Sequence, residues 1–355
     1  LVLIVLLSGL GLLILYSSSS RSLDLVYRQL IHLGLATSVM LVVAQIPPLL
    51  LMRSAPILMV LGIVLLILVL FFGSYGGGAQ RWLNLGFIKF QPSEMMKIIV
   101  PIGIASILSE STLPPRAFPV MVSLVGIAIV VLLIAKQPDL GTALLIGASG
   151  IYVLFFSGFR IRLLKNPWLN LGLISGILCG LLYGAWNYLL ISYQKNRILT
   201  LFNPESDPLG SGYHILQSKI AIGSGGFFGK GFLEGTQTRF DFVPEQSTDF
   251  IFCTIGEEWG FFGCLIFIIL FVSLLLRIIN LAERQRSSFC RIYGYGVASV
   301  LFIHFAINIG MTIGLSPVIG IPLPFISYGG SSLIGFTILL FIFLNLDSYR
   351  LQILR

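Results

Sequence analysis

The sequence is dominated by long apolar segments separated by shorter polar ones. A helix needs about 20 mainly apolar residues to cross roughly 30 Å of hydrocarbon, where its backbone groups must pair internally. Ten segments fit this requirement, the first of them as a truncated span: 1–16, 30–51, 55–73, 92–109, 117–135, 140–157, 168–191, 251–276, 290–313 and 328–346. The sequence therefore predicts an all-α polytopic membrane protein with ten transmembrane helices.

The composition excludes a soluble globular domain. Apolar residues make up 56% of the chain and charged residues only 10%, whereas soluble domains carry about 25% charged residues. The net charge of +8 does not point to nucleic acid, because basic residues between apolar segments are typical of cytoplasmic loops. The four cysteines form no CxxC pair, so neither a disulfide framework nor a zinc site is predicted.

The basic residues indicate how the chain is oriented. An even number of spans places both termini on one side, and only five basic residues fall in the short connections of the other side: Arg21, Arg28, Arg81, Lys89 and Lys136. Eleven fall on the side of the termini: Arg53, Arg116, Arg160, Arg162, Lys165, Arg277, Arg284, Arg286, Arg291, Arg350 and Arg355. The positive-inside rule therefore places both termini in the cytoplasm.

One connection, residues 192–250, is far longer than the others and would lie on the outer face. Loops of this length in compact proteins are either functional or disordered. This one contains many aromatic and aliphatic residues, so we expect an ordered extracytoplasmic loop with a short amphipathic helix near 213–222. Together with the spans it would form a single membrane-embedded domain over 1–355.

The glycine-rich segment from Gly223 to Lys230 has some features of a phosphate-binding loop. A Walker A motif, however, requires glycine at Ser224 and serine or threonine at Gly231. ATP hydrolysis is therefore not predicted. The glycines are expected to form a tight turn or to let the backbone approach a bulky ligand.

Charged residues near membrane depth are the strongest functional signal, since each costs about 2.5–3.5 kcal/mol on insertion scales. Glu94 and Lys97 are three residues apart at the start of an apolar segment, so they share a helix face and can form an ion pair. One interpretation is a buried pair that only fixes helix packing. The other is a functional pair at the outer surface.

Asp249 is the last charged residue before the segment 251–276. A carboxylate at this edge is partly desolvated, which raises its pKa toward that of a useful base; the alternative is an interfacial helix N-cap. Glu257 and Glu258 lie inside the segment, so at least one must face the bundle or a water-filled cavity. For these two glutamates, the sequence favours neither a packing role nor a chemical one.

Other polar residues have structural interpretations. His304 and Asn308 are four residues apart in the ninth segment and are typical of interhelical hydrogen bonding. Asp139 is placed to cap the segment that begins at 140. The prolines and glycines between 314 and 330 break the chain, and such irregular backbone is tolerated at membrane depth only inside protein or along a cavity.

Several longer motifs occur in a fixed order along the whole chain: Arg81-Trp-Leu-Asn-Leu-Gly86, Gln91-Pro-Ser-Glu-Met-Met-Lys97, Gln137-Pro-Asp-Leu-Gly-Thr-Ala-Leu144, Asp207-Pro-Leu-Gly-Ser-Gly-Tyr213, Gln217-Ser-Lys-Ile-Ala-Ile-Gly-Ser-Gly-Gly226, Gly235-Thr-Gln237, Pro244-Glu-Gln-Ser-Thr-Asp-Phe-Ile251 and Pro324-Phe-Ile-Ser-Tyr-Gly-Gly-Ser-Ser332. With these motifs the sequence resembles the SEDS family of shape, elongation, division and sporulation proteins. The segments 217–223 and 229–238 resemble the RodA-like branch more than the FtsW-like branch. One departure is Ser247, where the family pattern has histidine.

The resemblance implies a peptidoglycan glycosyltransferase that polymerises lipid II into glycan strands during cell-wall elongation. Its expected location is the bacterial cytoplasmic membrane, with the active site on the outer face. Lipid II and the growing strand are the implied substrates. The implied partners are a class B penicillin-binding protein, which is a transpeptidase, and other membrane proteins of the elongation complex.

The resemblance also implies roles for individual residues. Asp249 would be the general base, Lys97 would contact the diphosphate or orient Asp249, and Glu94 would position Lys97 or hold a metal ion. Four further residues are expected to contact substrate: Lys219, Arg197, Arg81 and Gln217. A divalent cation, Mg²⁺ or Mn²⁺, is expected at Glu94 or Asp249, and no organic cofactor is expected.

A lipid II flippase is the main alternative, and a noncatalytic scaffold is another. A flippase would use the same polar cavity without making a bond, and it would carry polar groups through the full membrane depth. The inner halves of the predicted spans are nearly uncharged, whereas Glu94, Lys97 and Asp249 are all predicted at the outer end. This distribution favours the enzyme.

Overall fold

The computed structural model describes residues 1–19, 21–76, 79–84, 89–109, 114–159, 166–208 and 210–349, and most of them are helical. Each predicted apolar segment overlaps a helix: α1 (Val2–Ser18), α2 (Leu23–Val43), α3 (Pro48–Phe72), α4 (Pro92–Ser109), α5 (Ala117–Lys136), α6 (Leu140–Phe156), α7 (Pro167–Gly184), α11 (Ile251–Glu283), α12 (Ser288–Thr312) and α13 (Gly330–Ser348). Within the described residues, seven of these are long and apolar enough to cross a membrane: α2, α3, α4, α5, α11, α12 and α13. The chain is therefore a polytopic helical membrane protein.

Two of the predicted boundaries are wrong. The span 30–51 was expected to end at 51 and the next span to begin at 55. Instead, α2 ends at Val43 and α3 begins at Pro48. The physical reason is proline: Pro47 is the N-cap of α3 and Pro48 its first residue. Proline lacks the backbone donor that a helix interior needs but fits its first turn.

The eighth predicted segment is also longer than expected and is not a single straight helix. It runs to Glu283 as α11, and Gly260 within it has φ 66° and ψ −160°. This left-handed conformation favours glycine. It separates a short first part, 251–259, from a second part that is long enough to cross the bilayer.

A small sheet corrects the prediction of an all-α fold. Between α3 and α4, the strands β1 (Ser74–Gly76), β2 (Ala79–Asn84) and β3 (Lys89–Phe90) pair antiparallel in the order β1-β2-β3. Side chains support the pairing, because the Gln80 amide donates to the carbonyl of Gly73 at 2.8 Å and the Ser74 hydroxyl to that of Trp82 at 3.1 Å. This connection is too short and too polar to be another span.

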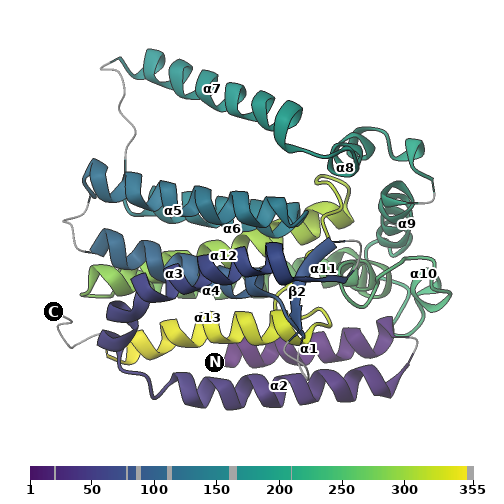
Figure 1. The fold of residues 1–355 in the computed structure, drawn as a ribbon. Helices are drawn as coiled ribbons and strands as arrows, with labels where there is room; N and C mark the ends of the chain where they lie inside the picture. Colours follow the sequence, from purple (N-terminus) through teal and green to yellow (C-terminus); the bar gives the residue numbers. More distant parts are fainter. Residues whose placement is uncertain are drawn as a thin grey trace.

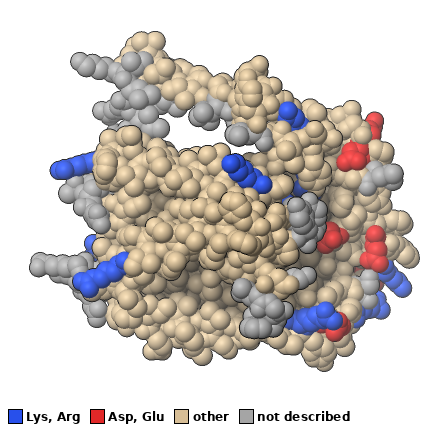
Figure 2. Space-filling view, viewed as in Figure 1, with Lys and Arg blue, Asp and Glu red and all other residues tan. Residues whose placement is uncertain are grey.

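The helices run roughly parallel to one another, with α4 and α12 in the interior (Figure 1). In both, 72% of the most apolar 18-residue window is buried, against 22% for α3 and 28% for α5. The outer helices expose large apolar side chains, such as Phe71 and Phe118, which suits contact with lipid. Helix α7 lies apart from this group (Figure 1), and a hollow is visible beneath it in Figure 2.

A second group of helices lies at one end of the bundle (Figure 1): α8 (Ser192–Phe202), the 3₁₀ turn η2 (Pro204–Ser206), α9 (Ser211–Ser224) and α10 (Thr236–Arg239). On the face shown in Figure 2, the acidic side chains gather at this end. Helix α9 confirms the helix predicted near 213–222. Its residues Ile215 and Ala221 pack with Val243, Phe250 and Cys253, which attaches the group to the start of α11.

The glycine-rich segment forms the tight turn that was predicted. Gly226, Gly229 and Gly231 all have positive φ. A Cβ at Gly229 would lie 2.0 Å from the carbonyl oxygen of Glu258. The amide of Lys230 donates to the carbonyl of Glu257 at 3.0 Å, so this turn packs backbone against backbone on α11.

The basic residues that indicated orientation are described only in part. Five of them, Arg160, Arg162, Lys165, Arg350 and Arg355, lie outside the described residues. The orientation of the chain across the membrane therefore stays a prediction from the sequence.

Replacing Gly229 with alanine tests the contact between the glycine turn and α11. Gly229→Ala should lower the free energy of unfolding by roughly 2 kcal/mol or more, because a Cβ would collide with backbone at a positive φ. Thermal unfolding in detergent measures the effect. Gly223→Ala is the matched control, since nothing lies within 4 Å of its added Cβ, and equal stability of the two variants would contradict the packing.

Candidate active site

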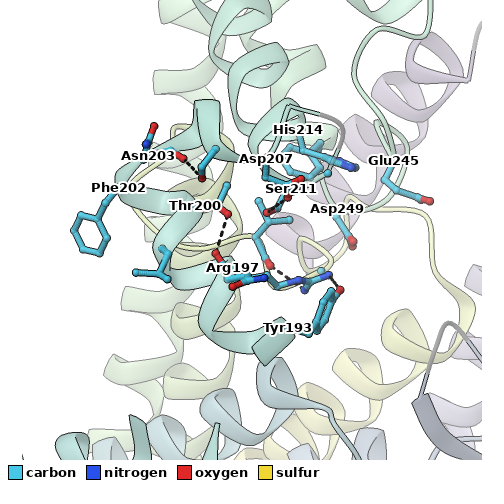
Figure 3. Close-up of a pocket in the computed structure, with 17 residues that line it drawn as sticks. Tyr193, Arg197, Thr200, Phe202, Asn203, Asp207, Ser211, His214, Glu245 and Asp249 are labelled. Carbon is cyan, nitrogen blue, oxygen red and sulfur yellow. Dashed lines mark hydrogen bonds between the residues drawn. The ribbon is translucent and has the colours of Figure 1, made fainter. Parts of the chain in front are cut away.

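Asp249 lies two residues before α11, where two cavities meet. One cavity has a volume of about 920 Å³ and lies among α8, α9 and the segment before α11 (Figure 3). The other, of about 640 Å³, lies between α8, the start of α6 and the α12–α13 connection. Five residues line both: Tyr193, Arg197, Asp249, Val318 and Gly320. The carboxylate is thus accessible from two directions.

The surroundings of Asp249 give its carboxyl group an unusual acidity. Its pKa is raised to about 6, mainly by burial and also by the nearby Glu245 carboxylate, and Arg197 limits the rise. A carboxylate with this pKa is still largely ionised at neutral pH, yet it is a better proton acceptor than an ordinary aspartate. In Figure 3 the Asp249 carboxylate lies on the side of the cavity where Arg197 and Tyr193 lie.

Arg197 is held in place by neighbours on both sides. Its guanidinium donates to the carbonyl of Val318 at 2.9 Å and to the hydroxyl of Tyr193, and it lies 4.6 Å from the centre of the Tyr193 ring. No ion pair is found for it within the described residues. Arg197 therefore presents a fixed positive charge between the two cavities, where an anionic group could bind.

His214, which the sequence reasoning missed, lines the larger cavity together with Asp249. It lies on α9, its ring centre is 5.6 Å from that of Phe250, and burial lowers its pKa. The Asp207 carboxylate on the same wall accepts hydrogen bonds from the amide and hydroxyl of Ser211. The available signal was a histidine directly after the motif that ends at Tyr213.

The smaller cavity contains the predicted residue Arg81 and the predicted cap Asp139. Arg81 lies on β2, 3.9 Å from the Asp139 carboxylate, and it also donates to the carbonyl of Pro138. Asp139 accepts a hydrogen bond from the amide of Thr142 at 3.3 Å, which confirms that it caps α6. A second guanidinium therefore lines the smaller cavity together with Arg197.

Glu94 and Lys97 form the ion pair that their spacing predicts, at 2.8 Å. The Lys97 ammonium lies 5.6 Å from the centre of the Phe336 ring, and His304 contacts the same ring at 4.8 Å. Neither Glu94 nor Lys97 lines the two cavities that contain Asp249. The pair lies between α4, α12 and α13.

The other two predicted substrate contacts, Gln217 and Lys219, lie on α9 outside both cavities. Lys219 is exposed, and its side chain packs against Gly314, where an added Cβ would lie 2.2 Å from Cε. Of the four residues predicted to contact substrate, Arg197 and Arg81 therefore share a cavity with Asp249.

Glu257 anchors the loop above α11. Its carboxylate is fully buried and accepts hydrogen bonds from the Lys230 ammonium and the Gln237 amide, both at 2.8 Å, and from the amide and hydroxyl of Thr238. Glu258 is also buried. Both glutamates face the interior, as expected for at least one, and the hydrogen bonds of Glu257 give it a structural role.

Comparison with known proteins identifies the family. The family model of FtsW, RodA and SpoVE, described as cell cycle proteins, matches residues 1–352. The peptidoglycan glycosyltransferase MrdB of Escherichia coli K12 is 43% identical over 322 residues, which cover 91% of this chain and 85% of that protein.

Solved structures agree with this match. A chain from a structure described as "Structural coordination of polymerization and crosslinking by a peptidoglycan synthase complex" has a TM-score of 0.82 at 31% identity, covering 99% of this chain and 97% of that one. The crystal structure of the rod shape determining protein RodA from Thermus thermophilus has a TM-score of 0.73 at 28% identity, covering 99% and 96%. The fold and site define a polytopic membrane protein with a carboxylate in a polar cavity at one end of the bundle. The chain belongs to the FtsW/RodA/SpoVE family, whose members are also called SEDS proteins.

The acidity of Asp249 can be tested without any assay of function. The difference between infrared spectra of the wild type and Asp249→Asn isolates the Asp249 carboxyl band, which should titrate with a midpoint near pH 6. Glu245→Gln removes a like charge and should lower the midpoint, and Arg197→Gln should raise it. Glu205→Gln, on η2 outside the cavity wall, is the control and should leave it unchanged; a wild-type midpoint near 4 would contradict the burial argument.

Proposed function

We propose that this chain is a peptidoglycan glycosyltransferase that polymerises lipid II, with Asp249 as general base. The observation that carries the proposal is the position of Asp249, a partly buried carboxylate of raised pKa at the junction of two cavities. A transferase needs to bring two substrates to one base. The relatives named as peptidoglycan glycosyltransferases and the similarity to a peptidoglycan synthase complex support the assignment.

The proposed step is a single displacement. The Asp249 carboxylate accepts the proton of the acceptor sugar's 4-hydroxyl as that oxygen attacks C1 of the donor's muramyl residue. The new bond joins acceptor oxygen to C1, and the bond from C1 to the diphosphate breaks. The polyprenyl diphosphate leaves with the electron pair, and the α-linked donor becomes a β-1,4-linked product.

Cationic groups near Asp249 suit the charge that develops on the leaving diphosphate. Arg197 lies between the cavities and Arg81 on the wall of the smaller one. Fixed donors aimed at developing charge are among the largest contributions to catalysis. We assign Arg197 and Arg81 to binding the diphosphates and place Gln217 and Lys219 at the periphery of the site.

A divalent cation, Mg²⁺ or Mn²⁺, fits this arrangement in one particular way. Within the described residues no three metal-binding side chains come together. Mg²⁺ is commonly held by one or two carboxylates plus substrate phosphates, and Asp249 faces the cavity whereas Glu94 is paired with Lys97. The ion would therefore be shared between Asp249 and the lipid diphosphate and would neutralise negative charge there.

The membrane arrangement follows from the same proposal. All ten helices cross the bacterial cytoplasmic membrane, both termini are cytoplasmic, and residues 192–250 form an extracytoplasmic loop within a single domain. In support, α8, α9 and α10 gather at one end of the bundle together with Asp249 (Figure 1). The hollow beneath α7 (Figure 2) would admit the polyprenyl tails from the lipid.

A class B penicillin-binding protein is the proposed partner, together with other membrane proteins of the elongation complex. The similar chain in a complex that coordinates polymerization and crosslinking supports this proposal. A polymerase paired with a transpeptidase would crosslink strands as they are made. The substrates would be lipid II and the growing glycan strand.

Substitution of Asp249 separates polymerase from flippase. Asp249→Asn keeps the size of the side chain but cannot accept a proton, so strand synthesis should fall by about 10²–10⁴-fold with lipid II binding largely retained. Wild-type activity should fall as the pH drops through about 6, because protonation removes the base. Gel analysis of strands with Mg²⁺ or Mn²⁺, alongside lipid II binding, is the measurement. Near-normal strand synthesis by Asp249→Asn would refute the assignment of Asp249 as general base. If neither the wild type nor the mutant made strands with the partner present, the flippase would be favoured.

Substitution of Lys97 tests the ion pair. We propose that Lys97 orients the α4 and α12 framework behind Asp249, with Glu94 holding the ammonium. Lys97→Ala should abolish polymerisation while the protein stays folded and monodisperse, as judged by size-exclusion chromatography and strand synthesis. Lys136→Ala, an exposed lysine at the end of α5, is the control and should stay active. If Lys97→Ala were inactive only because it unfolds, the role of Lys97 would be limited to packing.

A further inference from the structure

Asn308 makes an unusual pair of contacts beneath Asp249. It lies on α12 and is completely buried. Its side-chain nitrogen donates to the backbone carbonyl of Asp249 at 2.8 Å and to that of Ile321 at 2.6 Å. A single amide thus links the segment that carries Asp249 to the α12–α13 connection.

These two contacts determine which way the amide must face. Only the NH₂ group of asparagine has two donors, and a flipped amide would place Oδ1 against two carbonyl oxygens. In the observed orientation Oδ1 of Asn308 is buried without a partner. Buried polar atoms without partners are rare and are costly to stability. The fold therefore keeps both contacts to the backbone carbonyls, although they leave Oδ1 of Asn308 without a hydrogen bond.

Both contacts bear on the Asp249 carboxylate. The first fixes the backbone of Asp249 itself. The second fixes Ile321 directly after Gly320, which has φ +77° and where an added Cβ would lie 3.2 Å from the Asp249 carboxylate. Asn308 therefore holds the base and the backbone against which the base rests.

Neighbouring contacts complete this attachment. The Ser327 hydroxyl donates to the carbonyl of Thr248 at 2.5 Å, and the amide of Tyr328 donates to that of Ser247 at 2.9 Å. Three consecutive carbonyls, 247 to 249, are thus bound by α12 and the α12–α13 connection. Of the three contacts, the one at Asp249 comes from a side chain inside a helix.

We propose that Asn308 is a positioning residue that holds Asp249 at the junction of the two cavities. The inference rests on the proposed role of Asp249 as general base and adds the residue that orients it. Asn308 lines neither cavity and so acts only through Asp249. A misplacement of about 1 Å at a reacting group can lower a rate 10²-fold.

Asn345 provides a matched control for a purely structural role. It lies on α13, is 6% exposed, and its side-chain nitrogen also donates to two backbone carbonyls, of Val43 at 3.3 Å and Ile46 at 2.7 Å. These carbonyls belong to the α2–α3 turn, and Asn345 lines neither cavity. Asn345→Ala therefore removes the same kind of contact away from Asp249.

The experiment compares Asn308→Ala and Asn345→Ala in the full chain with its partner. Thermal unfolding, and kcat and KM for strand synthesis from lipid II, are measured for each. Both variants should lose similar stability. Asn308→Ala should lower kcat by about 10- to 100-fold with KM within about twofold, whereas Asn345→Ala should keep the wild-type rate per folded molecule.

The split between kcat and KM gives a readout that loss of packing alone would not produce. Asn308 lines neither cavity, so its loss should leave lipid II binding, and with it KM, nearly unchanged while kcat falls. In Asn345→Ala both constants should stay at their wild-type values per folded molecule. Should Asn308→Ala fail to fold, Asn308→Ser, which keeps one donor, replaces it with a smaller loss of kcat expected.

Two outcomes would overturn the inference. Equal losses of kcat in Asn308→Ala and Asn345→Ala would reduce Asn308 to a packing residue while Asp249 remained the base. Normal strand synthesis by Asp249→Asn, measured in parallel, would instead refute the base and with it the proposed function. The two failures are therefore distinguishable.

Discussion

Backbone groups within a bilayer have no water to pair with, and most of this architecture follows from that constraint. Helices satisfy it internally, which is why the apolar segments are helical. The α12–α13 connection cannot satisfy it in that way, and side chains supply the partners instead. Arg197 donates to Val318, Asn308 to Ile321 and the Ser327 hydroxyl accepts from the amide of Leu323. Side chains thus hold the irregular backbone beside Asp249 at several points.

This support allows the Asp249 carboxylate to lie in a partly desolvated site with defined neighbours. Burial and Glu245 raise the pKa of Asp249, while the charge of Arg197 limits the rise. A carboxylate in open water has too low a pKa to accept a proton readily. A buried carboxylate with no cation nearby has so high a pKa that it would already be protonated at neutral pH. The helices at the end of the bundle provide both conditions, because α8 contributes Arg197 and α9 covers the cavity with His214.

Much of the fold and part of the site could be predicted from the sequence. The Glu94–Lys97 pair follows from a three-residue spacing on one helix, and the cap by Asp139 from its place before an apolar segment. Helix limits at Val43 and Pro48 were missed because apolarity continues through the turn, although the two prolines were visible. The small sheet was missed because its strands are short and gain stability only from pairing with one another.

The sequence by itself determined that the chain spans a membrane, roughly which segments are helical and that Asp249 is the charge at the edge of α11. These are local properties, since apolar length and charge are read along the chain. Only the tertiary structure decided which residues share the cavities with Asp249. Arg197 and Arg81 lie there and Lys219 does not, although all three were candidates. His214 shares the larger cavity with Asp249, and Asn308 bonds to its carbonyl. The two residues come from helices far apart in sequence, because such placement depends on how the helices pack and no spacing along the chain records that packing.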